Sequence, residues 1–72
     1  MFDQEKFSSR IRALRKERRE TQQSLAALLG VSANQISEME NGTKTTSLPR
    51  LCLLCDHFGV SADYLLGRTD QP

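Results

Sequence analysis

The apolar residues of this chain recur at steps of three and four, the spacing of one side of an α-helix. Phe7, Ile11 and Leu14 show this spacing near the start, and residues 51–58 show it again. No segment alternates apolar and polar residues in the way a half-buried strand does. The pattern therefore predicts an all-α protein.

Capping residues divide the chain into five predicted helices. A Ser or Thr side chain before an apolar segment accepts a hydrogen bond from the first helical turn, and a Gly after it can adopt the left-handed conformation that ends a helix. The predicted N-caps are Thr21, Ser32, Ser47 and Ser61, and the predicted ends are Gly30, Gly42, Gly59 and Gly67. The first helix is expected from Asp3 or Gln4 to Arg19, the second up to Gly30, the third over 33–40, the fourth up to Gly59 and the fifth up to Leu66.

The expected inner stripes are Leu25, Leu28 and Leu29 in the second helix, Ala33, Ile36 and Met39 in the third, and Leu51, Leu54, Cys55 and Phe58 in the fourth. Ser32 and Gln35 are spaced as a capping box.

The length and composition exclude several classes of protein. A chain of 72 residues forms one small domain, which we expect over residues 1–67 with a polar tail or linker at 68–72. So small a core does not readily enclose a deep catalytic cleft, so we expect no enzyme and no small-molecule substrate. No run approaches the roughly 20 apolar residues of a membrane span, which predicts a soluble, cytoplasmic protein.

Cys52, Cys55 and His57 do not form a recognisable metal or haem motif. A haem motif needs His directly after the second Cys, where this chain has Asp56, and a structural zinc site needs four ligands. We therefore expect no metal and no cofactor, and we interpret Cys55 as a small buried apolar residue.

The positive charges are concentrated in one segment. The net charge is only +1, yet six of the ten Lys and Arg residues lie between Arg10 and Arg19. Such a segment is either a solvated helix face or part of a binding surface, and the sequence leaves both open.

The two short helices on either side of Gly30 carry the clearest functional signal. A helix, a tight turn with Gly, and a second helix with a thin apolar stripe is the arrangement of a helix-turn-helix, whose second helix enters the DNA major groove. The residues left on the polar side of that second helix are Asn34, Gln35, Ser37, Glu38 and Asn41. Asn and Gln can pair with adenine, a carboxylate can accept from cytosine, and Ser can bond to either kind of base edge.

The sequence resembles the Cro and phage-repressor-like helix-turn-helix domains, also called the XRE type, over about residues 7 to 67. The matching segments are residues 10–15, 21–26, 30–32, 36–42, 47–48, 58–61 and 63–67, together with Leu51 and Leu54. The resemblance implies a five-helix bundle with the helix-turn-helix at the second and third helices.

The resemblance also implies roles for individual residues. Base contacts are expected from Ala33, Asn34, Gln35, Ser37 and Glu38. Phosphate contacts are expected from Gln22, Asn41, Thr43 and Lys44, and from the helix N-termini at Thr21 and Ser32. Arg15 and Glu40 match a paired arginine and glutamate that the family often buries between the first and third helices.

Three departures from the family pattern stand out. Arg19 and Glu20 replace a usual Gly and apolar residue, so we expect a reshaped turn or a longer first helix. Thr46 replaces a usual proline in the loop after the third helix. The reading helix carries Glu38 and Glu40 but no Lys or Arg, which weakens attraction to phosphate.

The resulting hypothesis is a sequence-specific DNA-binding transcription regulator, most simply a repressor, that acts as a homodimer on a two-fold operator. The expected subunit contact involves Leu53, His57, Val60 and Tyr64. The alternative is a protein-interaction module, similar to an antitoxin, that binds DNA weakly or not at all.

Overall fold

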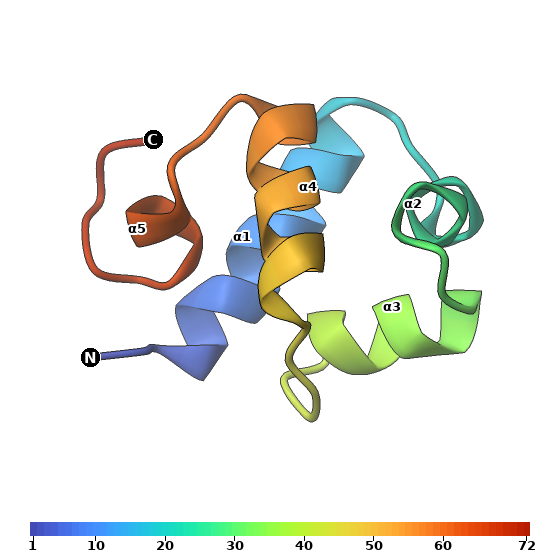
Figure 1. Ribbon diagram of the computed structural model, residues 1–72, viewed down its shortest axis with the longest axis horizontal. Coiled ribbons are helices and arrows are strands. Elements are labelled where there is room, and N and C mark those ends of the chain that lie inside the picture. Colours follow the sequence, from blue (N-terminus) through green and yellow to red (C-terminus); the bar gives the residue numbers. More distant parts are fainter.

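The computed structural model describes residues 1–72 and contains five helices and no strand (Figure 1). The helices are α1 (Gln4–Glu17), α2 (Gln22–Leu29), α3 (Ala33–Glu40), α4 (Leu48–Phe58) and α5 (Ala62–Leu65). In Figure 1, α2 and α3 lie on the right, α4 crosses in front of α1, and α5 lies on the left with both termini. The predicted all-α, five-helix fold is confirmed. None of these helices combines the length and the apolar character that crossing a membrane requires.

Side-chain caps begin the helices where the sequence predicted them. Thr21, Ser32, Ser47 and Ser61 each accept a hydrogen bond from the backbone N–H three residues later. The end of α1 was predicted wrongly, because α1 ends at Glu17 and not at Arg19. The physical reason is that Arg19 adopts a left-handed conformation with φ of 58°, which no α-helix can continue.

Eleven buried side chains from all five helices form one core. They are Phe7, Ile11, Leu25, Ala26, Leu29, Ile36, Met39, Leu51, Leu54, Phe58 and Leu65. The predicted stripe of α2 was wrong in one member: Leu28 is 41% exposed, and Ala26 is buried in its place. The buried side of α2 is centred on Leu25 and Leu29, and Ala26, not Leu28, lies on the side where α2 meets its neighbours. Ala33 and Cys55, also predicted as inner residues, are half-buried.

The C-terminal residues fold back onto α1 and α5. The Arg10 guanidinium donates hydrogen bonds to the backbone carbonyls of Tyr64 and Thr69 and to the carboxylate of Asp70. The hydrogen bond from Arg10 is the main cause that holds the pKa of Asp70 below its ordinary value. Residues 68–70, predicted only as part of a polar tail, therefore lie against the helices.

Candidate nucleic-acid interface

The α2–α3 unit is built around a tight turn at Gly30. Gly30 has φ of 70°, and the backbone N–H of Val31 donates to the carbonyl of Ala26. The next helix begins with the predicted capping box: Ser32 Oγ accepts from the Gln35 N–H at 3.2 Å, and Gln35 Oε1 accepts from the Ser32 N–H at 2.9 Å. These local bonds set the position at which α3 leaves the turn.

A buried ion pair fixes the other end of α3. Arg15 of α1 donates to both oxygens of Glu40, from Nε to Oε2 at 2.6 Å and from Nη2 to Oε1 at 2.8 Å. Gln22 Nε2 donates to Oε1 of the same carboxylate at 3.1 Å. The Glu40 side chain is 1% exposed and that of Arg15 is 11% exposed. The two residues matched to the family pair thus join α1 to the end of α3.

Opposing effects act on the ionisation of this pair. Burial would raise the pKa of Glu40, but hydrogen bonds from Arg15 and Gln22 outweigh it and lower that pKa below its ordinary value. The hydrogen bond to Glu40 in turn raises the pKa of Arg15. Every buried side-chain nitrogen and oxygen has a hydrogen-bond partner. Both members of the pair therefore keep their charge without an unpaired polar atom.

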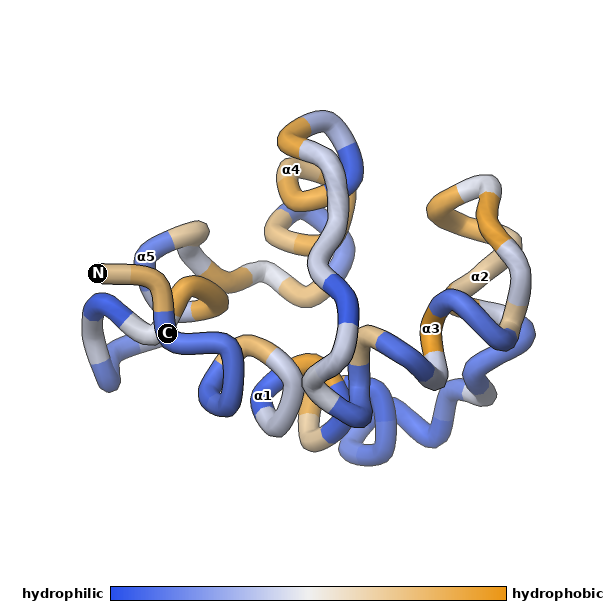
Figure 2. Tube along the Cα trace, turned by 90° about the horizontal axis from the view of Figure 1, so that it is seen from below, coloured by the Kyte–Doolittle hydropathy of each residue, from blue (hydrophilic) through white to orange (hydrophobic).

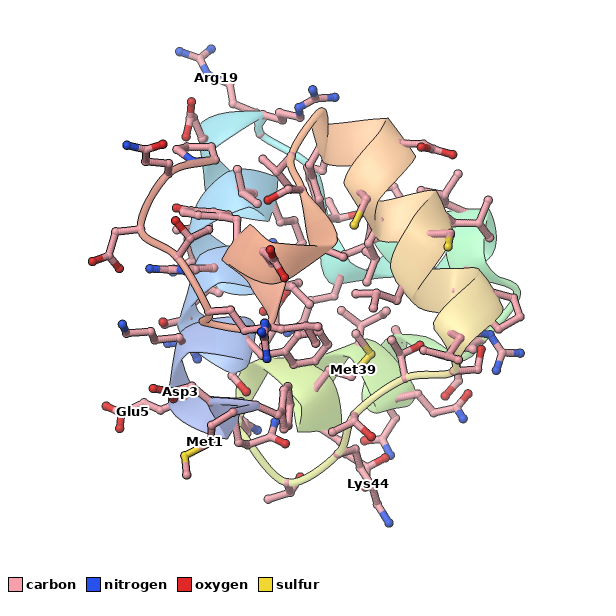
Figure 3. All side chains as sticks on the ribbon, turned by 60° about the vertical axis from the view of Figure 1, so that its left-hand side comes forward. Met1, Asp3, Glu5, Arg19, Met39 and Lys44 are labelled. Atoms are coloured by element: carbon pink, nitrogen blue, oxygen red, sulfur yellow. The ribbon has the colours of Figure 1, made fainter.

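The outer side of α3 is polar and open to solvent. Asn34, Gln35 and Asn41 are exposed, while Ser37 and Glu38 are half-buried. Ile36 and Met39 face the core, and Figure 3 shows Met39 directed into the bundle. Because Gln35 Oε1 is used by the capping box, the free hydrogen-bonding group of this side chain is its amide N–H₂.

The residues predicted to contact phosphate do not all present free side chains. The hydroxyls of Thr21 and Ser32 are occupied as N-caps, and the amide of Gln22 points to Glu40. Thr43 Oγ1 donates to the carbonyl of Glu38 at 3.1 Å. Lys44 is exposed, and its side chain points away from the body of the molecule (Figure 3).

The predicted subunit-contact residues lie on α4, on α5 and between them. Leu53 is 43% exposed on α4. His57, one turn later, is engaged with the α1–α2 turn, because its Nε2 lies 2.6 Å from Oε2 of Glu20. Val60 and Tyr64 pack against the core, and the Arg10 guanidinium lies 4.1 Å from the centre of the Tyr64 ring. Leu53 is therefore the only large apolar side chain of the four with a substantial exposed surface.

Sequence reasoning missed two of these contacts. The Glu20–His57 pair joins residues 37 positions apart, and the Arg10 bonds reach α5 and the tail across 54 to 60 positions. No local spacing signals either one. Cys52, Cys55 and His57 do not gather into a metal site, since no group of three or more His, Cys, Asp or Glu side chains is placed to hold an ion. Burial raises the pKa of the Cys55 thiol.

Comparisons with known proteins agree with this geometry. A family model described as "Helix-turn-helix" matches residues 11–65. The chain is 35% identical over 66 residues to the HTH-type transcriptional regulator YobD of Bacillus subtilis, which covers 92% of this chain and 59% of YobD. It is 37% identical over 57 residues to the antitoxin PezA of Streptococcus pneumoniae, which covers 79% of this chain and 36% of PezA.

A solved structure shows the same fold. The P22 c2 repressor, in complex with a synthetic operator, superposes with a TM-score of 0.78 at 35% identity, covering 83% of this chain and 91% of that one. The chain thus spans most of that repressor structure but less than two thirds of YobD and PezA.

Proposed function

Because the chain belongs to the XRE-type helix-turn-helix family of DNA-binding regulators, we propose that it is a sequence-specific repressor that reads double-stranded DNA with α3. The observation that carries this proposal is the outer side of α3: a polar, exposed helix face held at its start by a capping box and at its end by the Arg15–Glu40 pair. A helix fixed at both ends keeps its side chains in register with base edges.

Each side chain on that face fits a different part of a base pair. Asn34 can donate to N7 and accept from N6 of adenine. Glu38 can accept from N4 of cytosine, and Ser37 can bond to either kind of edge. Gln35 offers only its amide N–H₂, so it suits acceptors such as guanine O6 and N7 better than adenine. Ala33 suits the methyl group of thymine.

Phosphate contacts would flank this face. The N-termini of α2 and α3, at Thr21 and Ser32, each present backbone N–H groups that attract an anion. Gln22 donates one amide proton to Glu40 and keeps a second for a phosphate. Asn41, Thr43 and Lys44 follow α3 and would contact the other strand of the same groove.

The proposed functional unit is a homodimer on a two-fold operator. Successive major grooves on one face of DNA are about 34 Å apart, so two copies of α3 would lie at that separation. The exposed Leu53 would be the centre of the contact, with His57, Val60 and Tyr64 around it. The likeness to the P22 c2 repressor, solved on a synthetic operator, supports a repressor that acts in the cytoplasm.

Selection of bound duplexes from a random DNA pool tests the proposal. A palindromic consensus is expected, and Glu38→Gln should raise binding to random DNA while it relaxes the preference at one base pair by about 1 to 3 kcal/mol. Asn34→Ala should weaken binding to the selected site and leave binding to random DNA nearly unchanged. If neither variant changes the selected sequence or its affinity, α3 does not read DNA.

A second candidate function is a protein-interaction module similar to an antitoxin. The likeness to PezA and the absence of any Lys or Arg from α3 favour it. In that case wild-type protein would show no selected consensus and would bind random DNA weakly at every salt concentration. A gel shift on random DNA over a salt series separates the two candidates.

A further inference from the structure

The six cations between residues 10 and 19 have different surroundings. Three of them already have partners: Arg10 binds the C-terminal tail, Arg15 binds Glu40, and Arg18 lies over the Phe58 ring. A fourth, Arg19, extends into solvent (Figure 3). The other two, Arg12 and Lys16, lie one helical turn apart on α1 and line the same groove. The nearest carboxylate oxygen to Arg12 is 4.0 Å away, on Glu40, and half of the Arg12 side chain is exposed.

This groove lies between α1 and the C-terminal end of α3. Its volume is about 680 Å³, and Glu40, Asn41 and Gly42 form the side nearest α3. The segment that joins α3 to α4 passes beside α1 in the view from below (Figure 2), where Gln4 Nε2 donates to the carbonyl of Lys44 at 3.2 Å. The groove therefore adjoins residues 41–44, which directly follow the proposed reading helix.

The groove has an excess of positive charge. Two acids, Glu5 and Glu40, line it, but the Glu40 charge is balanced by its pair with Arg15 beneath the groove. Arg12 and Lys16 then outnumber the one acid without a close cation, Glu5. Because α3 has no cation of its own, attraction for the DNA backbone has to come from residues beside it.

We propose that this groove is a binding site for the DNA phosphate backbone, with Arg12 and Lys16 as its charged ligands and the Asn41 amide as a neutral donor. The inference rests on the proposed function and adds α1 to its DNA-binding surface. The Arg12 guanidinium would donate two parallel bonds to one phosphate, and the Lys16 ammonium would contact the next as a point charge. The backbone would then run from the end of α3 along α1.

The test is the salt dependence of binding to a random-sequence duplex, measured by fluorescence anisotropy between about 50 and 200 mM KCl. Each phosphate contact contributes about 0.9 to the slope of log K against log salt concentration. The double variant Arg12→Gln, Lys16→Gln should reduce that slope by about 1.8 per monomer. Between the lowest and the highest salt concentration, the fold-loss of affinity should therefore be about ten times smaller for the variant than for wild type. Its preference for a selected site over random DNA should not change.

Arg19→Gln, Arg68→Gln is the matched control, since it removes the same charge from exposed positions outside the groove. Arg12→Lys, Lys16→Arg keeps the charge and should restore the slope. Thermal unfolding of each variant checks that the fold is intact. An unchanged slope in the groove variant, or an equal reduction of the slope in the control variant, would overturn the inference. Binding by the wild-type protein would still uphold the proposed function. If wild type binds neither duplex, both fail.

Discussion

The two turns on either side of α2 share a left-handed backbone but use different residues to form it. The α2–α3 turn has Gly30 at φ of 70°, and the α1–α2 turn has Arg19 at φ of 58°. Glycine adopts this conformation without strain, whereas for a residue with a Cβ atom the conformational strain costs about 1 to 2 kcal/mol. Similar backbone geometry therefore rests on different energetics at the two turns.

The two turns share local backbone bonds and differ in their side-chain contacts. The α2–α3 turn is held by bonds among residues 26–35, which are close in sequence. The α1–α2 turn has equivalent backbone bonds, from the Arg19 N–H to the Lys16 carbonyl and from the Glu20 N–H to the Arg15 carbonyl. It adds two side-chain contacts: Glu20 pairs with His57 of α4, and the Glu20 carbonyl accepts from Arg15 Nη1 at 2.8 Å. Arg15 also binds Glu40, so the stability of this turn is linked to the end of α3. The comparison shows that local bonds hold the turn inside the helix-turn-helix, whereas the turn before it adds to its local bonds a contact with α4 and, through Arg15, a link to α3.

The largest expected effect comes from breaking that link. Glu40→Ala should lower the free energy of unfolding by about 3 to 5 kcal/mol, because it leaves the mostly buried Arg15 guanidinium without its partner. Urea unfolding measures the loss. Hydrogen exchange should show weaker protection at the Glu20 amide, in the α1–α2 turn, than at the Val31 amide, in the α2–α3 turn. A melting temperature within a degree or two of wild type would mean that the pair contributes little.

Acid should weaken the same link without a mutation. The folded pKa of Glu40 lies below its ordinary value of 4.5, so the stability it contributes is complete above pH 4.5 and is lost as the pH falls through the folded pKa. Unfolding curves at decreasing pH should fall more steeply for wild type than for Glu40→Gln. Asp70→Asn is the control: the pKa of Asp70 is also lowered, but that group lies at the exposed tail. This variant should therefore keep most of the acid sensitivity of wild type. Equal acid sensitivity of wild type and Glu40→Gln would contradict the assignment.

The two turns also show how much the sequence could predict. Gly30, Ser32 and Gln35 lie within six residues, and their spacing alone gave the turn, the cap and the start of α3 correctly. The left-handed Arg19 could not be predicted, because an arginine rarely adopts positive φ. The contact of the next residue, Glu20, with His57 has no local signal either, since only the folded chain brings the two together. The sequence therefore predicts the features that bonds between neighbouring residues determine.

The same limit explains the partial success at the candidate site. The polar side of α3 followed from the narrow stripe of Ile36 and Met39, whose burial the structure confirms. The exposure of Leu28 could not be deduced, because an eight-residue helix with three leucines fits more than one rotation about its axis. Nor could the sequence tell which cations between residues 10 and 19 would be free, since their partners lie on α3, α4 and the tail.

Gly30→Ala tests the local turn and should have the next largest effect. The added Cβ would meet no atom within 4 Å, so the cost is backbone strain alone, about 1 to 2 kcal/mol in the free energy of unfolding. Gly59→Ala is the matched control, because Gly59 has φ of 66° and equally open surroundings after α4. Similar losses for both, measured by thermal unfolding, would support the strain account. A much larger loss at Gly30 would show that its turn has contacts beyond those described.

Arg19→Gly should have the smallest effect and the opposite sign. Removing the Cβ atom relieves the left-handed strain at φ of 58°, while the extra freedom of glycine in the unfolded chain offsets part of the gain. The net expectation is a stabilisation of about 0.5 to 1 kcal/mol by urea unfolding. Arg19→Ala separates this from loss of the exposed side chain, since it removes the guanidinium but keeps the Cβ and should give no stabilisation. If both variants gain equally, charge repulsion between Arg19 and the nearby cations, and not backbone strain, is the cost at this turn. The contrast between Arg19 and Gly30 then loses its energetic basis.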